Sequence, residues 1–400
     1  MVANIRGVFI TGASGFLGSS LVDEFINRGI KVSALVRSDE KEAELRKKYS
    51  SFVREGKIRI YRGDVTQPEN GNGVAVLDNV GDLGEISNQN EAVVDCAGLV
   101  NFMAKKEDLK EVNIKGSKNV VRLVRQINDE RNKQGLTPLE KFVKISTAYV
   151  NPLGNGDIRE GVLMARDSYP NSYEWSKRRS IEHLNRVRRR GIFNGTLVDV
   201  ISPGIIVGSM DEDGDHGGKQ MTFNGYSFGI ARGILQAHYK GNRAAFMSDY
   251  EKNLDPEQRP LKVRLIGNPE VKKRFLWNDE VARRSVALVL RENDPHGRNF
   301  HIVGEPISGH DIQKTLNAIL PVAQFRYVGD LIPNPTEVEQ KIMDYTGPFA
   351  YYTLHTDSFL TEMADYFLGR AGYVPYKMSA DGFTNVINRF VMSDIVKKVK

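Results

Sequence analysis

A tyrosine and a lysine stand four positions apart in the segment Tyr173-Glu174-Trp175-Ser176-Lys177. On a helix this spacing places the phenol and the ammonium on one face. Because a nearby ammonium favours the phenolate, Lys177 is expected to lower the pKa of Tyr173 from about 10 towards neutrality. A phenol of that acidity is a competent proton donor to a developing alkoxide. The pair therefore indicates acid catalysis at a carbonyl oxygen.

A second pair with the same spacing, Tyr373 and Lys377, encloses Pro375. A helix interior does not tolerate proline, so these two side chains need not share a face. A third chemical group near the first pair is Thr147, at the carboxyl end of a predicted strand, where its hydroxyl can donate to the same substrate oxygen. The adjacent Ser146 is expected to point elsewhere, because side chains alternate along a strand.

Asn113 lies in the helix predicted after the fourth strand. We expect it to support Lys177 through a water, and the alternative is an amide on the helix surface. No metal site is expected. The single cysteine, Cys96, excludes a multi-cysteine cage and an internal disulfide, and its alternative roles are an acylated nucleophile or an inert strand-end residue. The seven histidines form no pair at metal spacing, and the acidic loop 211–215 lacks the glycine and glutamate of an EF-hand.

Three glycines, Gly12, Gly15 and Gly18, lie between the first predicted strand and the first predicted helix. Gly12 permits a tight turn, Gly15 lets the backbone approach a pyrophosphate, and Gly18 lets helix and strand pack closely. The helix then presents unpaired N–H groups and its positive dipole end to the phosphates. This arrangement predicts a dinucleotide site, in which Lys177 would also hold the nicotinamide ribose.

The residues after the second and third strands bear on which dinucleotide binds. An NAD-selective site would have an acidic residue at the end of the second strand, but this chain has Arg37 there. A guanidinium suits an adenosine 2′-phosphate, so NADPH is expected in preference to NAD. Asp39 lies close by and could hold the ribose hydroxyls, so NAD remains the alternative cofactor. Asp64 could accept a hydrogen bond from the adenine amino group or could simply form a turn.

The elements that must position these residues alternate along the chain. Strands are predicted at 8–11, 31–37, 57–62, 92–97, 142–146 and 197–202, and helices at 15–28, 40–48, 109–126 and 173–190. The alternation predicts an α/β fold: a Rossmann-type doubly wound parallel sheet with a ligand crevice at the carboxyl ends of its strands. We expect a binding domain over 1–205, with elements returning around 262–304. A smaller, mostly helical substrate-binding region is expected from 206–261 and 305–400.

Composition limits the class of protein. Hydrophobic residues make up 40% and charged residues 26% of the 400 residues, which excludes a mostly disordered chain. The net charge of +6 is too thinly spread for a nucleic-acid-binding surface. No apolar run approaches the roughly 18–20 residues that span a bilayer, and no signal peptide is evident. A soluble, cytoplasmic protein is therefore expected.

Six segments together form a pattern that is more specific than any one motif. They are TGASGFLG (11–18), YRGDVTQP (61–68), CAGLVNF (96–102), EVNIKGS (111–117), KISTAYVN (144–151) and PNSYEWSK (170–177). On these segments the chain resembles an extended short-chain dehydrogenase/reductase, closest to the fatty acyl-CoA reductase and thioester reductase branch. The resemblance covers the first two hundred residues well. It continues more thinly in SPGIIVGS (202–209), RFLWNDEVA (274–282) and HIVGEP (301–306).

By position, the resemblance implies that Thr147, Tyr173 and Lys177 are the catalytic set, with Asn113 in support. It implies that the following residues contact the cofactor: Gly12, Ser14, Gly15, Phe16, Leu17, Gly18, Arg37, Asp64, Val65, Ala97, Lys177, Pro203, Gly204 and Ile205. The chain departs from the pattern at Ser202, where many relatives have arginine. Its carboxyl-terminal region also matches the family's substrate end poorly.

The activity implied is NADPH-dependent reduction of an acyl thioester, bound to CoA or to a carrier protein, or of the derived aldehyde. The alternatives are oxidoreduction of a sterol or other ketone, nucleotide-sugar epimerisation or dehydration, and a regulator that binds the dinucleotide without turnover. The resemblance also implies a homodimer formed through the helices predicted at 109–126 and 173–190.

Two further groups of residues each allow two interpretations. A run of arginines at 186 and 188–190 is either a solvated face or a docking site for CoA phosphates or an acidic carrier. The aromatic residues of the carboxyl-terminal third either line an acyl tunnel or form the core of the smaller domain: Tyr351, Tyr352, Phe359, Tyr366, Phe367 and Phe383.

Overall fold

The central feature of the fold is a seven-stranded sheet in which all neighbouring strands are parallel. The computed structural model describes residues 4–68, 73–154, 156–166, 168–193, 195–208, 222–252, 255, 257, 259, 261–292, 294 and 297–397. The strand order is β10 (Asn299–Ile302), β6 (Leu197–Pro203), β5 (Lys141–Ile145), β4 (Ala92–Asp95), β1 (Gly7–Thr11), β2 (Lys31–Val36) and β3 (Ile58–Arg62). The order reverses direction at β1, so the predicted Rossmann-type sheet is confirmed.

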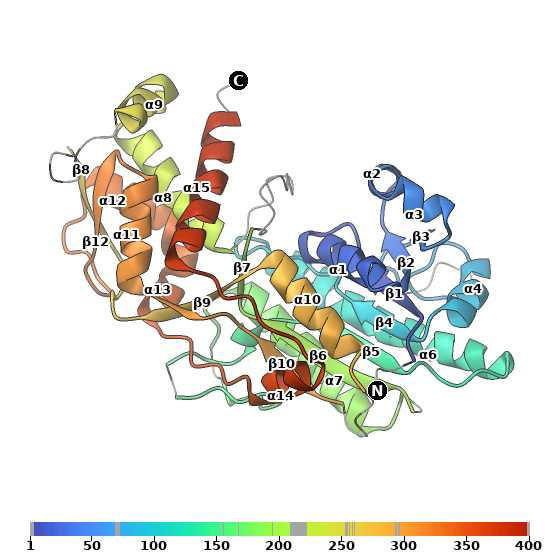
Figure 1. The fold of residues 1–400 in the computed structure, drawn as a ribbon. Coiled ribbons are helices and arrows are strands. Elements are labelled where there is room, and N and C mark those ends of the chain that lie inside the picture. The colour runs from blue at the N-terminus through green and yellow to red at the C-terminus, as the bar shows by residue number, and fades with distance from the viewer. Residues whose placement is uncertain are drawn as a thin grey trace.

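Helices cover both faces of this sheet (Figure 1). One face packs against α1 (Phe16–Asn27), α10 (Asn278–Val289) and α14 (Glu362–Arg370), and the other against α4 (Gly81–Gln89), α6 (Gly116–Lys133) and α7 (Ser172–Arg189). Side chains of β5 alternate between the two cores: Val143 and Ile145 face α1 and α10, whereas Phe142 packs on the other side. Burial on both faces explains why the strands read as nearly continuous apolar runs.

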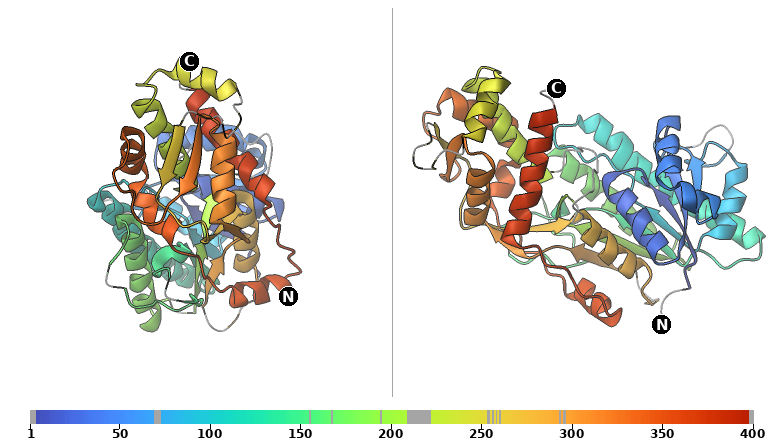
Figure 2. Two further views of the ribbon diagram at one scale, coloured as in Figure 1. Left: turned by 90° about the vertical axis from the view of Figure 1, so that its left-hand side faces the viewer. Right: turned by 45° about the horizontal axis from the view of Figure 1, so that its top comes forward.

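A second group of elements lies beside the sheet (Figure 2). It holds a three-stranded sheet of β7 (Ile205–Val207), β9 (Lys272–Trp277) and β11 (Pro306–Ser308), and a parallel pair, β8 (Leu261–Leu265) with β12 (Ala323–Tyr327). Its helices are α8 (Thr222–Ala237), α9 (Arg243–Glu251), α11 (Gly309–Ile319), α12 (Glu337–Thr346), α13 (Ala350–Leu354) and α15 (Ala380–Lys397). Within 262–304, therefore, β8 and β9 join these smaller sheets, while α10 and β10 belong to the central one.

The helix that carries the Tyr173–Lys177 pair begins where the site needs it. Asn171 is the N-cap of α7, and its side chain accepts a hydrogen bond from the backbone N–H of Glu174 at 2.9 Å. Tyr173 consequently lies in the first turn of α7. Since α7 follows β5, this turn lies near the carboxyl ends of the strands. The helix after β4 is interrupted: α5 (Lys106–Leu109) passes into a π-helical segment, η1 (Lys110–Lys115), before α6.

The second tyrosine–lysine pair is outside any helix, as Pro375 predicted. The Tyr373 hydroxyl donates to Glu280, and Lys377 pairs with Glu305 at 3.3 Å. Among the described residues, no helix is long and apolar enough to cross a membrane.

Candidate active site

A cavity of about 520 Å³ lies at the carboxyl ends of β1, β4, β5 and β6. It brings the glycine turn, Thr147 and the Tyr173–Lys177 pair to one place. Its lining residues are Gly12, Gly15, Phe16, Leu17, Gly18, Cys96, Gly98, Val100, Phe102, Ile145, Ser146, Thr147, Tyr149, Tyr173, Glu174, Lys177, Pro203, Gly204, Ile205, Ile206 and Tyr352.

The glycine turn has the shape that a pyrophosphate site requires. Gly12 has φ +69°, and a Cβ there would lie 2.8 Å from backbone atoms of Ala97. A Cβ on Gly18 would lie 2.0 Å from the carbonyl oxygen of Gly12. At Gly15, the N-cap of α1, none of the described side chains caps the helix, so the first N–H groups of α1 remain for a ligand in the cavity that Phe16 and Leu17 also line. These residues fit a dinucleotide phosphate.

The Tyr173–Lys177 pair is buried, and burial controls its electrostatics. Burial, followed by the charge of Glu174, raises the pKa of Tyr173 above its usual value. The expectation that Lys177 would lower it is therefore wrong for this environment, because desolvation of the phenolate dominates. Burial, reinforced by the neighbouring charge of Lys144, lowers the pKa of Lys177 to about 8. At neutral pH the phenol is protonated, which is the form that a proton donor needs.

The lysine Nζ lies 5.9 Å from the centre of the Tyr173 ring and 3.5 Å from the carbonyl oxygen of Ile145. Beneath it, Lys144 forms a buried ion pair with Asp95 at 2.7 Å. The carboxylate of Asp95 also accepts a hydrogen bond from Thr11 at 2.8 Å. This buried network fixes the ends of β1, β4 and β5 under the reacting groups.

Thr147 and Ser146 both line the cavity. Ser146 contributes to the lining, but its Oγ is buried and makes no hydrogen bond within the described part of the chain, so the expectation that its side chain points elsewhere stays a prediction. The Thr147 hydroxyl donates to the carbonyl oxygen of Pro203 and accepts from the N–H of Tyr149, both at 3.4 Å. It thereby caps the short 3₁₀ turn η2 (Ala148–Val150).

Asn113 is buried in the π-helical segment, so it is not on the helix surface. Its amide accepts from the N–H of Leu99 at 2.8 Å and donates to the Leu99 carbonyl at 3.0 Å and to Ser176 at 2.9 Å. A Cβ added to Gly98 would lie 3.0 Å from the Nζ of Lys177 and 3.3 Å from the Oδ1 of Asn113. The asparagine thus holds the loop after β4 against α7.

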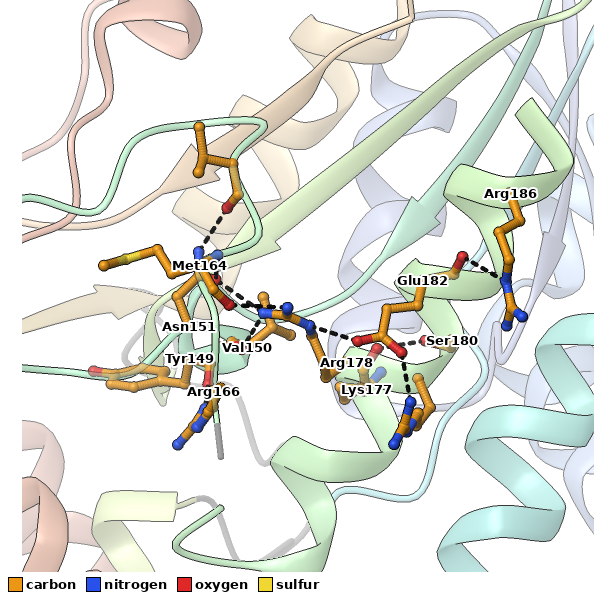
Figure 3. A network of polar contacts seen from close by, with 12 residues as sticks. Tyr149, Val150, Asn151, Met164, Arg166, Lys177, Arg178, Ser180, Glu182 and Arg186 are labelled. Carbon is orange, nitrogen blue, oxygen red and sulfur yellow. Dashed lines mark hydrogen bonds and ion pairs between the residues drawn. The ribbon is translucent and has the colours of Figure 1, made fainter. Parts of the chain in front are cut away.

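A second polar network ties the loop after β5 to α7 (Figure 3). The guanidinium of Arg178, the residue after Lys177, donates to the carbonyl oxygens of Val150 and Met164 and to the side chain of Asn151, at 2.9–3.3 Å. It also pairs with Glu182 at 2.9 Å. Because Arg178 and Lys177 are adjacent, this clamp fixes the catalytic helix relative to the residues that follow Thr147.

Aromatic rings form the side of the cavity opposite the glycine turn. Phe102, from the loop after β4, lies 5.5 Å from the ring of Tyr173 and 5.5 Å from that of Tyr352. Tyr149 meets Tyr352 edge-on at 5.4 Å. Sequence analysis missed Phe102 and Tyr149, since nothing in their local pattern distinguishes them from core residues. The rings provide an apolar, partly enclosed surface for the organic part of a substrate.

Glu174 is another lining residue that sequence analysis missed. It is buried, accepts a hydrogen bond from the Tyr352 hydroxyl, and pairs with Arg166 at 2.6 Å. Burial raises the pKa of its carboxyl to about 7, against the opposing charge of Arg166. Its only sequence signal is its position directly after Tyr173.

The residues predicted for the adenosine end lie apart from this cavity, at the ends of β2 and β3. Arg37 is exposed just beyond β2, and Arg62 pairs in register with Val36. Arg62 lies 3.3 Å from Asp39, and its Nη1 is buried without a hydrogen-bond partner in the described part of the chain. Asp64 forms a turn, accepting from the N–H and hydroxyl of Thr66.

Other predicted contacts serve the packing around the turn. The N–H of Ala97 donates to the hydroxyl of Thr11 at 3.2 Å, and the carbonyl of Val65 accepts from Asn119 at 2.9 Å. Ser14 is half-buried in the glycine turn. Burial raises the pKa of Cys96 to about 11, so its thiol is protonated and fits the inert role.

Several sequence features lie away from the cavity. The arginine run ends α7, at the opposite end of the helix from Tyr173. Of the six aromatic residues of the carboxyl-terminal third, Tyr352 lines the cavity, and the ring of Tyr351 packs against that of Tyr352. Phe359, Phe367 and Phe383 are buried in hydrophobic cores, and Tyr366 is exposed. The acidic loop 211–215 lies outside the described residues.

Comparisons with known proteins agree with this geometry. A 217-residue stretch is 26% identical to the L-2-aminoadipate reductase large subunit of Penicillium chrysogenum, covering 50% of this chain and 15% of that protein. Two solved structures share the fold at 18% identity. The terminal R domain from the myxalamid PKS-NRPS pathway has a TM-score of 0.66 and covers 98% of this chain and 91% of its own. A thiolation-reductase di-domain from an archaeal non-ribosomal peptide synthetase has a TM-score of 0.67, with 100% and 76% covered.

A parallel sheet of this order, with a glycine turn facing a tyrosine and a lysine across one cavity, defines an NAD(P)-dependent oxidoreductase of the extended short-chain dehydrogenase/reductase type. The chain belongs to the NAD-binding family described as "Male sterility protein", whose pattern matches residues 10–249, and it lies near the thioester reductase branch. It spans a small part of the length of the curated relatives that it matches.

Proposed function

We propose that this chain reduces an acyl group held as a thioester, using NADPH, and releases an aldehyde. The observation that carries the proposal is that Tyr173, Lys177 and Thr147 face one cavity together with the glycine turn. The likeness to reductase domains of peptide synthetases supports a carrier-bound substrate over CoA.

Each step of the proposed reduction is assigned to residues that line the cavity. The bound reduced nicotinamide supplies a hydride to the carbonyl carbon of the thioester. Tyr173 donates its phenolic proton to the carbonyl oxygen, and the hydroxyl of Thr147, just after β5, stabilises the charge that develops there. Lys177 holds the nicotinamide ribose and stabilises the phenolate that remains.

The product of this step is a hemithioacetal, which collapses when its hydroxyl proton returns to Tyr173 and its C–S bond breaks. The carbon becomes an aldehyde and the sulfur leaves as a thiolate that takes a proton from water. No thiol of the chain takes part, in accord with the protonated Cys96. The aromatic wall of Phe102, Tyr149 and Tyr352 limits access of water to the acyl group.

Preference for NADPH is the second part of the proposal. Two guanidinium groups, those of Arg37 and Arg62, stand at the ends of the adjacent strands β2 and β3. The Arg62 side chain is 30% exposed, and its Nη2 lies 3.3 Å from the carboxylate of Asp39. A 2′-phosphate would accept from both groups in a charge-assisted contact.

The experiment that tests the function follows NADPH absorbance with one acyl group presented on a carrier protein, on CoA and as a free aldehyde. The aldehyde product is trapped as a hydrazone and identified by mass. We expect consumption of NADPH with the carrier-bound thioester and equal formation of aldehyde. If neither thioester nor the aldehyde supports consumption of NADPH, the proposal is wrong.

A further inference from the structure

A second, smaller cavity adjoins the active-site cavity at its aromatic wall. Its volume is about 30 Å³, room for about one or two water-sized groups. Ile205 and Tyr352 line both cavities, so these two side chains stand between them. The rest of the lining comes from the group of elements beside the central sheet, and includes the buried side chains Val271, Phe275 and Ile312.

The lining of the second cavity suits a hydrocarbon. Lys273 also borders it, but its charge is paired with Asp357 at 2.6 Å. The carboxylate of Asp357 in turn accepts from the hydroxyl of Tyr149 at 2.7 Å and from the N–H of Arg274 at 3.1 Å, so this ion pair needs no ligand. A void between apolar side chains leaves them without contacts on one side, and methylene groups that fill it restore those contacts.

Phe349, at the end of the 3₁₀ turn η4 (Gly347–Phe349), lies between the two cavities. It lines the second one, and its ring centre lies 5.5 Å from that of Phe102, which lines the first. Its ring also meets Tyr226 edge-on at 6.0 Å, and a Cβ added to Gly225 would lie 3.2 Å from its Cζ. The ring is therefore packed between Phe102 and α8, on the path from one cavity to the other.

Tyr352 and Phe349 separate the cavities in different ways. The hydroxyl of Tyr352 donates to Glu174 and accepts from Asn171, so polar contacts hold that ring in place. Phe349 has no polar atom on its side chain, and only its volume closes the path. Phe102 lies 5.5 Å from the ring of Tyr173 as well. An acyl chain that starts at Tyr173 and follows Phe102 therefore meets Phe349.

We propose that Phe349 is a specificity-determining residue that sets how long a hydrocarbon chain the acyl group can carry. The chain lies along Phe102 and Tyr352 with its end against the Phe349 ring, and the second cavity becomes accessible when that ring is shortened. The substrate class is then an acyl thioester with an apolar, unbranched chain of limited length. The inference rests on the proposed function, because it takes the carbonyl to be reduced beside Tyr173.

The test measures kcat/KM for a series of straight-chain acyl thioesters and the matching free aldehydes. In the wild type, each added methylene that gains apolar contact should raise kcat/KM by about fourfold, until the chain reaches Phe349 and the value falls. In Phe349→Leu and Phe349→Ala, the volume removed joins the second cavity, and we expect the optimum to move to chains about two methylenes longer or more. Phe349→Leu keeps most of the packing, so the test does not depend on the alanine variant folding.

Phe246→Leu is the matched control, because Phe246 is buried in the same hydrophobic core and lines neither of the two cavities. We expect it to lower Tm as Phe349→Leu does and to keep the wild-type optimum, a difference that a merely structural role of Phe349 would not produce. An unchanged optimum in both Phe349 variants, or a wild-type kcat/KM that does not depend on chain length, refutes the role of Phe349 while thioester reduction stands. A wild type that consumes no NADPH with any thioester or aldehyde overturns both.

Discussion

The hydroxyl of Tyr352 donates a hydrogen bond to the carboxylate of Glu174, 178 residues earlier in the chain. Tyr352 also accepts from the side-chain amide of Asn171, the N-cap of α7, at 2.7 Å. One tyrosine from α13 therefore holds two residues that flank Tyr173 in the first turn of the catalytic helix. The carboxyl-terminal third of the chain thus helps to build the site that the first half supplies.

Removing this hydroxyl should weaken both the fold and the catalyst. Tyr352→Phe keeps the ring beside Phe102 but leaves Glu174 with Arg166 as its remaining partner. We expect a loss of about 1–3 kcal/mol in the free energy of unfolding, because a buried acceptor loses its donor. We also expect a lower kcat/KM, since the first turn of α7 is less firmly held. Denaturant unfolding and NADPH-coupled turnover measure the two effects.

Tyr366→Phe is the matched control, because the Tyr366 ring is exposed and its hydroxyl accepts a hydrogen bond from Arg370 at 3.3 Å. Its unfolding free energy should stay within about 0.5 kcal/mol of the wild type. Equal losses in the two variants would show that the Glu174 contact contributes nothing specific.

Tyr173→Phe removes the proton donor without changing the shape of the site. We expect turnover to fall at least about 100-fold while the Kd for NADPH, measured by fluorescence titration, stays the same. Tyr373→Phe is the control from the second tyrosine–lysine pair, whose hydroxyl meets Glu280 away from the cavity. A Tyr173→Phe enzyme with near-normal turnover would remove Tyr173 from the mechanism.

The pH dependence of reduction should report on Lys177. Burial lowers its pKa to about 8, so the ammonium is present below that pH and is lost above it. If the charged form stabilises the phenolate, kcat/KM should be level below about pH 7 and fall about tenfold per unit well above 8. Lys177→Arg keeps its charge through this range, so we expect lower activity without the falling limb. A wild-type rate that rises above pH 8 would contradict this role.

The titration of Lys177 affects the stability of the fold in the opposite direction from kcat/KM. The pKa of Lys177 is lower in the folded chain than its ordinary value of 10.5, so between about pH 8 and 10.5 the unfolded chain binds more protons. The contribution of this residue to the free energy of unfolding therefore increases with pH in that window. Monitoring Tm alongside kcat/KM keeps the two effects apart.

Selectivity between the dinucleotides should depend on the two arginines at the adenosine end. We expect Arg37→Ala and Arg62→Ala each to raise the KM for NADPH about tenfold or more, since a charge-assisted contact is lost, and to leave the KM for NADH nearly unchanged. Arg54→Ala, at the exposed end of α3 (Ser50–Arg54), is the control. Equal changes for NADPH and NADH would exclude a 2′-phosphate role.

The fold was predictable because its signals are local. A glycine turn between a strand and a helix, and alternating apolar strands and helices, are set by backbone freedom and by burial over a few residues. The same holds for the Tyr173–Lys177 pair, whose alignment follows from helical spacing, and for the rejection of the second pair through Pro375. The paths of β8 and β9 could not be read in this way, because strand pairing depends on partners far along the chain.

The sequence by itself determined the sheet, the glycine turn and the alignment of Tyr173 with Lys177 on one helix. Tertiary structure alone decided their environment: that Phe102 packs against both Tyr173 and Tyr352, and that Glu174 is buried. It also reversed the expected direction of the Tyr173 pKa. The physical reason is that desolvation and hydrogen-bond partners come from segments remote in sequence, so neither can be read from spacing along the chain.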